Sequence, residues 1–317
     1  MPLHIFGTDS LPHPPSPMPI PEQQLDTWSN QGAVVTAQAT HVSVRAALAA
    51  NSSPIREMDY DVFLQGSYRN GTNVRVDSDV DIIVRYNSTF AHNASVLPAP
   101  QGQIFNAQFS NAIYLWIHFR THVLAALRAY YGHGEVEETE RCLKVAAAPG
   151  RVPGDVVPAI PYKNYSYFYG TAADANAHVE GIRFEDWNGR VIINYPDQHY
   201  DNGVAKNSVV RTGGRFKQTV RLFKNARTRA MERRFLADGV ASSYFVDCLI
   251  WNVPDNLFVV SLQDTYCGIV NYLHSNVVTG YYCRNGIVPL FGNAPEQWTE
   301  AKARQLIAAL ARLWNEW

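Results

Sequence analysis

The sequence predicts an α+β fold, in which a mixed sheet flanked by helices is followed by a helical lobe. Between about residues 60 and 195, short apolar runs alternate with turn residues, as expected for strands. From residue 197 onward, apolar residues recur at helical spacing between breaks at Gly, Pro and Asn. We therefore expect a first lobe over residues 18–196 and a helical lobe over residues 197–317, after a Pro-rich tail at residues 1–17.

The composition fits a protein with a sizeable core and no general attraction for nucleic acid. Of the 317 residues, 46% are hydrophobic and 17% are charged, and the formal net charge is −1. Any phosphate site must therefore come from a local cluster of cations. The four cysteines are widely spaced and form no C-x-x-C motif, which favours reduced thiols in the cytoplasm. We find no signal peptide and no apolar run long enough to span a membrane.

The N-terminal part of the first lobe is expected to be one long helix. Pro21 suits a first helical turn, and apolar residues continue at helical spacing to about Ala50. The tail before it lacks periodicity, so Met18 is a candidate for the natural start. Further along, we expect a helix at 105–131, strands at 142–148 and 154–160, and a hairpin at 180–195 turning at Asn188 and Gly189. The helices of the second lobe are expected near 197–209, 214–236, 242–252, 262–277 and 296–315.

The strongest functional pattern is the stretch LQGSYRNGTNVRVDSDVDIIVR at residues 64–85. It predicts a strand, a tight turn with a short helix start, a loop and a second strand. Asp79 and Asp81 are two residues apart at the second strand and so share one face, whereas Asp77 stays in the loop. Two carboxylates on one face repel each other unless a cation lies between them, and their hard oxygen atoms suit Mg²⁺.

The turn before these acids predicts a phosphate site. Gly66 allows the backbone to approach a ligand closely, and Ser67 follows at a helix N-terminus, where free amide groups bind anions. Gln65 precedes them in the same turn. The stretch therefore combines a turn that holds a triphosphate with carboxylates that hold metal ions.

These residues carry a family resemblance. A Gly-Ser turn followed by hD(X)Dh resembles the polymerase-β-like nucleotidyltransferases. The longer string QGSYRNGTNV…DSDVDIIV is similar to the cGAS/DncV-like nucleotidyltransferases (CD-NTases) of bacterial anti-phage signalling, clade E (CdnE-type). The later strings YFVDCLIWNVPDNLF and LFG…EQW extend the resemblance from about Met18 to the C-terminus. It implies a polymerase-β-like lobe and a helical lobe joined by a long N-terminal spine helix.

The resemblance also implies a third carboxylate and further nucleotide ligands. Asp155, in DVVPA, matches the acid that a neighbouring strand supplies; read alone, it could cap a turn. Ser243 and Tyr244 match a pair that holds phosphate and base, although Ser-Ser-Tyr is also an ordinary helix start. Asn194, in NYP, offers the amide pattern that complements uracil, and it could equally be a turn residue.

A local excess of positive charge lies in residues 204–234, with ten Lys or Arg against one acid. Lys217, Arg221 and Lys224 share a helix face, which would neutralise triphosphate if it faced the cleft and would otherwise be solvated. Lys224, in VRLFKN, resembles the family lysine that contacts the donor's phosphates. We also expect Lys206 among the nucleotide ligands.

The implied function is a cyclic dinucleotide synthase that releases pyrophosphate and uses two Mg²⁺ ions, with Mn²⁺ as a substitute, on UTP and ATP. The expected product is cyclic UMP–AMP, or alternatively a cyclic dipyrimidine such as c-di-UMP. A monomer in the cytoplasm, a downstream effector that responds to the cyclic nucleotide, and no membrane or stable nucleic-acid partner complete the expectation. Three other functions stay open: a tailing polymerase or a transferase acting on a small molecule or protein, a non-catalytic nucleotide sensor, and an RNA-activated sensor.

Overall fold

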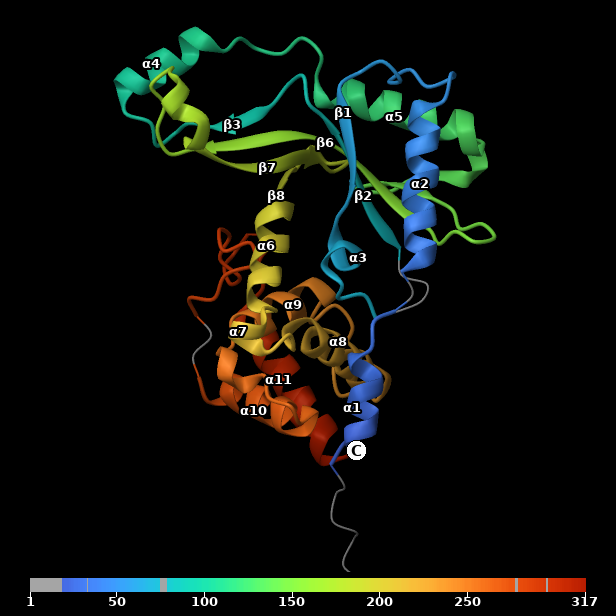
Figure 1. Ribbon diagram of the computed structural model, residues 1–317, viewed down its shortest axis with the longest axis vertical. Helices are drawn as coiled ribbons and strands as arrows, with labels where there is room; N and C mark the ends of the chain where they lie inside the picture. The colour runs from blue at the N-terminus through green and yellow to red at the C-terminus, as the bar shows by residue number, and fades with distance from the viewer. Residues whose placement is uncertain (1–18, 33, 75–78, 277–278, 295) are drawn as a thin grey trace, which may run out of the picture.

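The computed structural model describes residues 19–32, 34–74, 79–276, 279–294 and 296–317. The predicted tail at 1–17, the candidate start at Met18 and the loop residue Asp77 lie outside the described residues. The chain forms a sheet-containing lobe above a helical lobe, with the C-terminus at the far end of the helical lobe (Figure 1). The predicted α+β architecture is confirmed.

The first lobe is built on an eight-stranded sheet in the order β1-β2-β6-β5-β4, with β3 and β7 also paired to β6, and β8 paired to β7. Strand β6 is long because it serves both parts of the sheet: its first half lies parallel to β2 and its second half pairs with β7. The strands are β1 (Tyr60–Leu64), β2 (Val80–Tyr86), β3 (Ala91–Asn93), β4 (Val136–Glu138), β5 (Leu143–Val145), β6 (Gly154–Tyr165), β7 (His178–Glu185) and β8 (Val191–Asn194).

The helices of the first lobe cover the sheet, and one of them, α3, leads toward the helical lobe. Apolar residues of α2 and α5 pack with those of the strands in one buried cluster that includes Val44, Ile82 and Phe119. A short helix, α3, connects β1 with the loop before β2 and points toward the helical lobe (Figure 1). These helices are α2 (Val35–Ala49), α3 (Gly66–Asn70), α4 (Ala99–Gln108) and α5 (Trp116–Tyr131).

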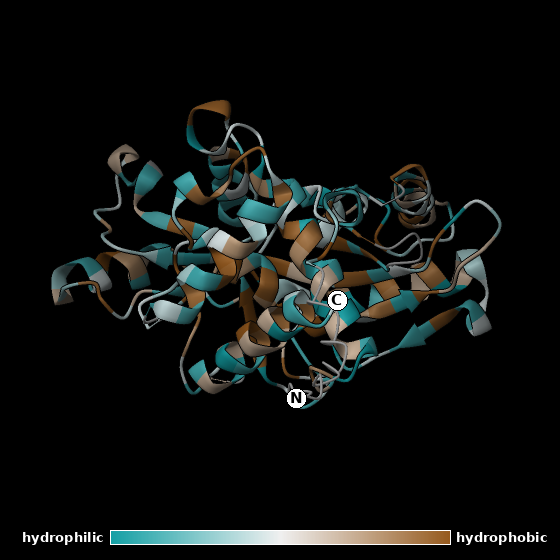
Figure 2. Cartoon of the chain, turned by 90° about the horizontal axis from the view of Figure 1, so that it is seen from below, coloured by the Kyte–Doolittle hydropathy of each residue, from teal (hydrophilic) through white to brown (hydrophobic). Residues whose placement is uncertain are grey.

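The helical lobe has its own core, which contains Phe223, Phe245 and Tyr266. Hydrophobic and hydrophilic residues alternate along its helices, as expected when one face is buried (Figure 2). Its helices are α1 (Glu22–Ser29), α6 (Pro196–Lys206), α7 (Val209–Thr212), α8 (Phe216–Glu232), α9 (Ser243–Trp251), α10 (Leu262–Ser275) and α11 (Glu300–Asn315).

The expected single helix from Pro21 to Ala50 is two helices, α1 and α2. The chain between them is anchored by contacts that a continuous helix could not make. The Gly32 N–H donates to the Asn73 carbonyl at 3.0 Å, and Arg221 donates to the carbonyl of Ser29 at 2.6 Å. As a result α1 packs in the core of the helical lobe, through Leu25, whereas α2 packs on the sheet.

Three further boundaries differ from the prediction. The helix expected at 105–131 is split into α4 and α5, and the one expected at 197–209 is α6, which already ends at Lys206 and is followed by the short α7. The hairpin at 180–195 is confirmed, but its loop spans Asp186–Arg190 instead of two residues. The Asp186 carboxylate accepts bonds from the backbone N–H groups of Asn188 and Arg190, each at 2.9 Å, and these bonds hold the wider loop.

No helix in the part of the chain that the structure describes is long and apolar enough to cross a membrane.

Candidate active site

The turn between β1 and α3 lies directly against the predicted metal ligand Asp81. Gly66 has a φ of +66°, and a Cβ atom built on it would lie 1.9 Å from Oδ2 of Asp81. Only glycine fits this position, because a side chain would strain the positive φ and would also collide with Asp81. Ser67 is the second residue of α3, and its backbone belongs to the helix start, where amide groups lack partners within the helix. The side-chain oxygen of Gln65 is buried without a hydrogen-bond partner among the described residues.

The three predicted carboxylates meet at one edge of the sheet. Asp79 directly precedes β2 and Asp81 is the second residue of β2, so the two side chains share a face. Asp155 on β6 is in register with Asp81 on the parallel neighbouring strand. Strands of one sheet are about 4.8 Å apart, so Asp155 lies beside Asp81, the placement that the family resemblance implied.

Without a cation between them, each carboxylate makes ionisation of its neighbours less favourable. Burial, together with Asp155 and Asp79, raises the pKa of Asp81 to about 6. Burial and Asp79 also raise the pKa of Asp155, and one oxygen of Asp155 is buried with no partner in the described chain. Buried, hard, mutually repelling oxygen atoms fit a divalent cation, which would relieve both the repulsion and the unmet hydrogen-bonding capacity.

Lys144 is a member of this group that the sequence reasoning missed. It lies on β5 in register with Asp155, and its Nζ is 2.6 Å from Oδ2 of Asp79. Among the described residues, no group of three or more His, Cys, Asp or Glu is arranged to hold a metal ion as the side chains stand. The sequence did offer a signal for Lys144, since it is a charged residue between two apolar residues of a predicted strand.

Lys224 extends from α8 of the helical lobe toward the carboxylates. Its ammonium group is buried and lies 3.2 Å from both the carbonyl and the hydroxyl of Thr72, and 3.4 Å from Asp247. It is close enough to Asp81 to oppose the rise in the pKa of that carboxyl. The sequence predicted a role in the site for Lys224 but not its partners Thr72 and Asp247, which come from other elements.

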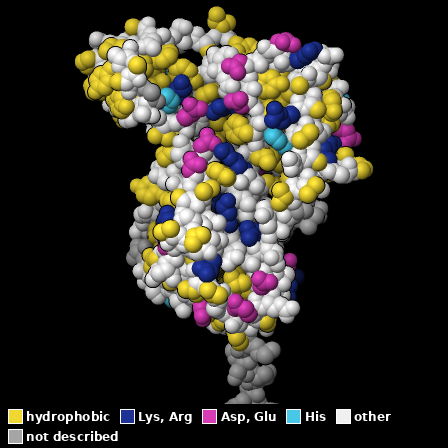
Figure 3. All heavy atoms as spheres, viewed as in Figure 1, with side chains coloured by type: hydrophobic (Ala, Val, Ile, Leu, Met, Phe, Trp, Pro, Cys, Tyr) yellow, Lys and Arg dark blue, Asp and Glu magenta, His cyan; other side chains and the backbone are white. Residues whose placement is uncertain are grey.

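The other basic residues of 204–234 are largely engaged in structural contacts. Lys206 is buried and donates to the Val253 carbonyl at 2.7 Å and to Asp255 at 2.9 Å, so the prediction that it contacts nucleotide is not supported by its position. Arg221 donates to backbone carbonyls at the end of α3 and α1. On the face drawn in Figure 3, Lys and Arg side chains lie where the two lobes meet.

Ser243 and Tyr244 start α9, as predicted. Ser242 is the helix cap, and the hydroxyl of Ser243 accepts a 2.8 Å bond from Arg227. The ring of Tyr244 is 42% exposed, and His199 stacks on it with ring centroids 5.4 Å apart. Burial and Arg284 lower the pKa of His199 to about 3, so this imidazole is neutral at ordinary pH.

Asn194 ends β8, immediately before Tyr195 and α6. It is half-buried, and its side-chain amide has no hydrogen-bond partner among the residues that the structure describes. The amide is therefore free to bind a ligand.

Comparison with known proteins identifies the family. Residues 44–149 match a nucleotidyltransferase domain model, and residues 201–315 match the cGAS/DncV-like nucleotidyltransferase C-terminal helical domain. The chain is 42% identical over 304 residues to a cyclic UMP-AMP synthase from Rhodothermus marinus, covering 95% of this chain and 99% of that protein. It is 36% identical to the cyclic nucleotide synthase CdnE01 of Staphylococcus haemolyticus, covering 95% and 100%.

The structure agrees with this placement. It matches that of the Rhodothermus marinus CdnE c-UMP-AMP synthase with Apcpp and Upnpp at a TM-score of 0.83 and 41% identity, covering 94% of this chain and 98% of that one. Enzymes of this kind use divalent metal ions. The chain belongs to the cGAS/DncV-like nucleotidyltransferases, and within them to the CdnE group.

Proposed function

We propose that this protein is a cyclic dinucleotide synthase that joins two nucleoside triphosphates, with a uridine-containing product, cyclic UMP–AMP first. The observation that carries the proposal is the register of Asp81 with Asp155 beside the α3 turn, because it gathers three acids where a triphosphate would bind. The functions of its relatives support it, since they include cyclic UMP-AMP and cyclic dipyrimidine synthases.

The proposed chemistry is two successive nucleotidyl transfers in one site. In each, a ribose hydroxyl oxygen bonds to the α-phosphorus of a triphosphate, the bond to the β-phosphate breaks, and pyrophosphate leaves as the hydroxyl loses its proton. Asp79, Asp81 and Asp155 would hold two Mg²⁺ ions, with Mn²⁺ as a substitute. Such ions supply charge stabilisation for the attacking and leaving oxygens. In the second transfer the remaining hydroxyl of the linear intermediate closes the ring.

The protein's own groups bind and orient the substrates in this scheme. The amides at the start of α3 and the hydroxyl of Ser67 hold the β- and γ-phosphates, aided by the positive charge of Lys224. Tyr244 is 42% exposed, and its ring is the proposed platform for a base. Gln65, whose buried oxygen lacks a partner among the described residues, and Ser243 complete the proposed set of nucleotide ligands.

The decisive experiment incubates the purified protein with all four nucleoside triphosphates and Mg²⁺ and identifies the products by mass spectrometry. We expect a cyclic dinucleotide and two pyrophosphates for each product. The variant Asp79→Ala with Asp81→Ala should form none while keeping its fold by circular dichroism. Undiminished product from that variant would refute the metal site. A linear or acceptor-dependent product would favour a tailing polymerase or another transferase, and nucleotide binding without pyrophosphate release would favour a sensor.

The choice of base is proposed to depend on Asn194. Its unpartnered amide carries an acceptor and two donors, which complement the O4 and N3–H of uracil. Asn194→Ser should shift the product toward purines, measured as the ratio of uridine to purine in the cyclic product. An unchanged ratio would remove this assignment and leave the cyclic dipyrimidine alternative to be judged from the wild-type product alone.

The proposed setting is bacterial anti-phage signalling, in which a monomer in the cytoplasm makes a second messenger for a separate effector. The four cysteines are free, which suits a reducing compartment. A net charge of −1 supports the proposal that no stable nucleic-acid complex forms. The boundaries 18–196 and 197–317 stay a prediction, with the qualification that α1 packs in the helical core.

A further inference from the structure

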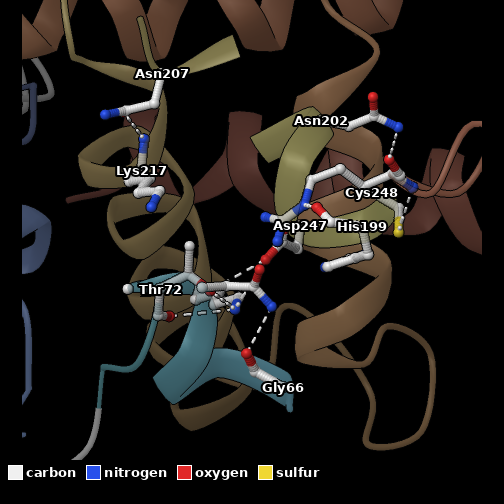
Figure 4. Close-up of polar contacts among 12 residues, drawn as sticks. Gly66, Thr72, His199, Asn202, Asn207, Lys217, Asp247 and Cys248 are labelled. Atoms are coloured by element: carbon white, nitrogen blue, oxygen red, sulfur yellow. Dashed lines mark hydrogen bonds and ion pairs between the residues drawn. The ribbon is translucent and has the colours of Figure 1, made fainter. Parts of the chain in front are cut away.

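A buried cluster of charges joins the two lobes beneath the proposed site. Asp247 on α9 lies between Lys224 on α8 and Arg284, and it also accepts a 3.2 Å bond from the hydroxyl of Thr72, just after α3 (Figure 4). All four residues are at most 3% exposed. The cluster therefore connects the segment just after α3, at Thr72, with the core of the helical lobe.

The two oxygens of Asp247 have different partners. Oδ1 takes a short ion pair with Arg284, which is fully buried and is further fixed by a 2.9 Å bond to the carbonyl of His199. Oδ2 faces Lys224 and Thr72. Burial alone would raise the pKa of Asp247, but Arg284 and Lys224 outweigh it and lower the pKa to about 2. Two basic side chains thus share one carboxylate, and burial lowers the pKa of Lys224, as does Arg284, whereas Asp247 opposes this.

Lys224 is held loosely compared with a matched lysine in the same lobe. Its ammonium contacts are 3.2, 3.2 and 3.4 Å long. The ammonium of Lys206 lies 2.7 and 2.9 Å from its two partners, and charge-assisted bonds are usually about 2.7–2.9 Å long. Because Arg284 takes the short contact with Asp247, Lys224 is retained at the turn by the longer contact of 3.4 Å and by Thr72.

We propose that Asp247 is a positioning residue for nucleotidyl transfer, which acts by holding Lys224 against Thr72 with its charge available to substrate phosphate. This inference rests on the proposed function. Both oxygens of Asp247 are already engaged, by Arg284, Lys224 and Thr72, so its effect on the reaction passes through Lys224. If the cluster were merely structural, substitution of Asp247 would lower folding stability but leave kcat of the folded variants unchanged.

A double-mutant cycle separates these two roles, because only residues that act together give non-additive effects. Asp247→Asn should lower kcat by about 10- to 100-fold, the loss expected when a catalytic group is displaced by about 1 Å. In a Lys224→Met background, the same change should alter kcat by less than about twofold, because the group that Asp247 positions is already gone. Thr72→Val should show the same dependence on Lys224, and it leaves no buried charge unpaired if Asp247→Asn proves unstable.

Asp255→Asn is the matched control, since Asp255 also bonds one lysine, Lys206, and one arginine, Arg211, but within the helical lobe. We expect it to lower Tm and leave kcat within about twofold of wild type. Losses that multiply in the Lys224→Met background, in variants folded at the assay temperature, would overturn the proposal. An inactive wild-type protein would instead refute the proposed function, so the two failures are distinguishable.

Discussion

Replacing Gly66 by alanine tests the contact on which the site is built. The new Cβ would lie 1.9 Å from Oδ2 and 2.8 Å from Cγ of Asp81. Real Cβ contacts are at least about 3 Å, so the carboxylate must move by about 1 Å or more. The residue also keeps a φ of +66°, which costs an alanine about 1–2 kcal/mol.

These two effects have different consequences. The backbone cost lowers the free energy of unfolding and should lower Tm by a few degrees. The displaced carboxylate should lower kcat/KM by about 100-fold, as expected for a misplacement of about 1 Å at a reacting centre. Asp81 is half-buried beside Asp79 and Asp155, whose charges raise its pKa, so displacing its carboxylate changes the spacing of the three acids.

Gly189→Ala separates the two effects. Gly189 has a φ of +73°, and a Cβ built there has no atom within 4 Å, so this variant has the backbone cost without the contact. We expect similar losses of Tm in the two variants, measured by calorimetry, and near wild-type pyrophosphate release only in Gly189→Ala. If Gly66→Ala retained activity within about threefold of Gly189→Ala, the inferred dependence on the position of Asp81 would be wrong.

Two further predictions follow from the charges. Lys144→Met removes the cation that is 2.6 Å from Asp79 and should tighten Mg²⁺ binding by about tenfold, measured by titration calorimetry; weaker binding would show that Lys144 supports the site. The lowered pKa of Asp247 adds about 2 kcal/mol of stability, which is fully present above pH 4 and is lost as pH falls toward 2. The stability difference between wild type and Asp247→Asn should therefore shrink over that interval in acid denaturation, whereas a constant difference would exclude ionisation as its source.

The carboxylate edge could be predicted from the sequence because its parts are local. Asp79 and Asp81 are two residues apart, and a strand places alternate residues on one face whatever the rest of the chain does. The turn at Gly66 is adjacent in sequence to the same strand pair. Asp155 was harder, since its approach depends on the parallel register of β6 with β2, and a family resemblance supplied that information.

The roles of the basic residues could not be predicted in this way. Lys206 and Lys224 belong to the same cationic stretch, and nothing local distinguishes them. Lys206 meets Asp255 and Lys224 meets Asp247, and these acids come from elements that only the tertiary fold brings close. The interrupted N-terminal helix has the same cause, because Arg221, far along the chain, binds the carbonyl of Ser29.

The distribution of charge also explains why the two lobes must act together. Among the described residues, the sheet lobe brings three acids and the cation Lys144 together, an excess of negative charge that disfavours a polyphosphate. The helical lobe supplies Lys224, which opposes the rise in the pKa of Asp81 and contacts Thr72, just after α3. We therefore expect binding of an anionic nucleotide beside the acids to depend on divalent cations from solution and on Lys224, which Asp247 holds at the turn. The contact between lobes is part of the site for this electrostatic reason, and not only a support for it.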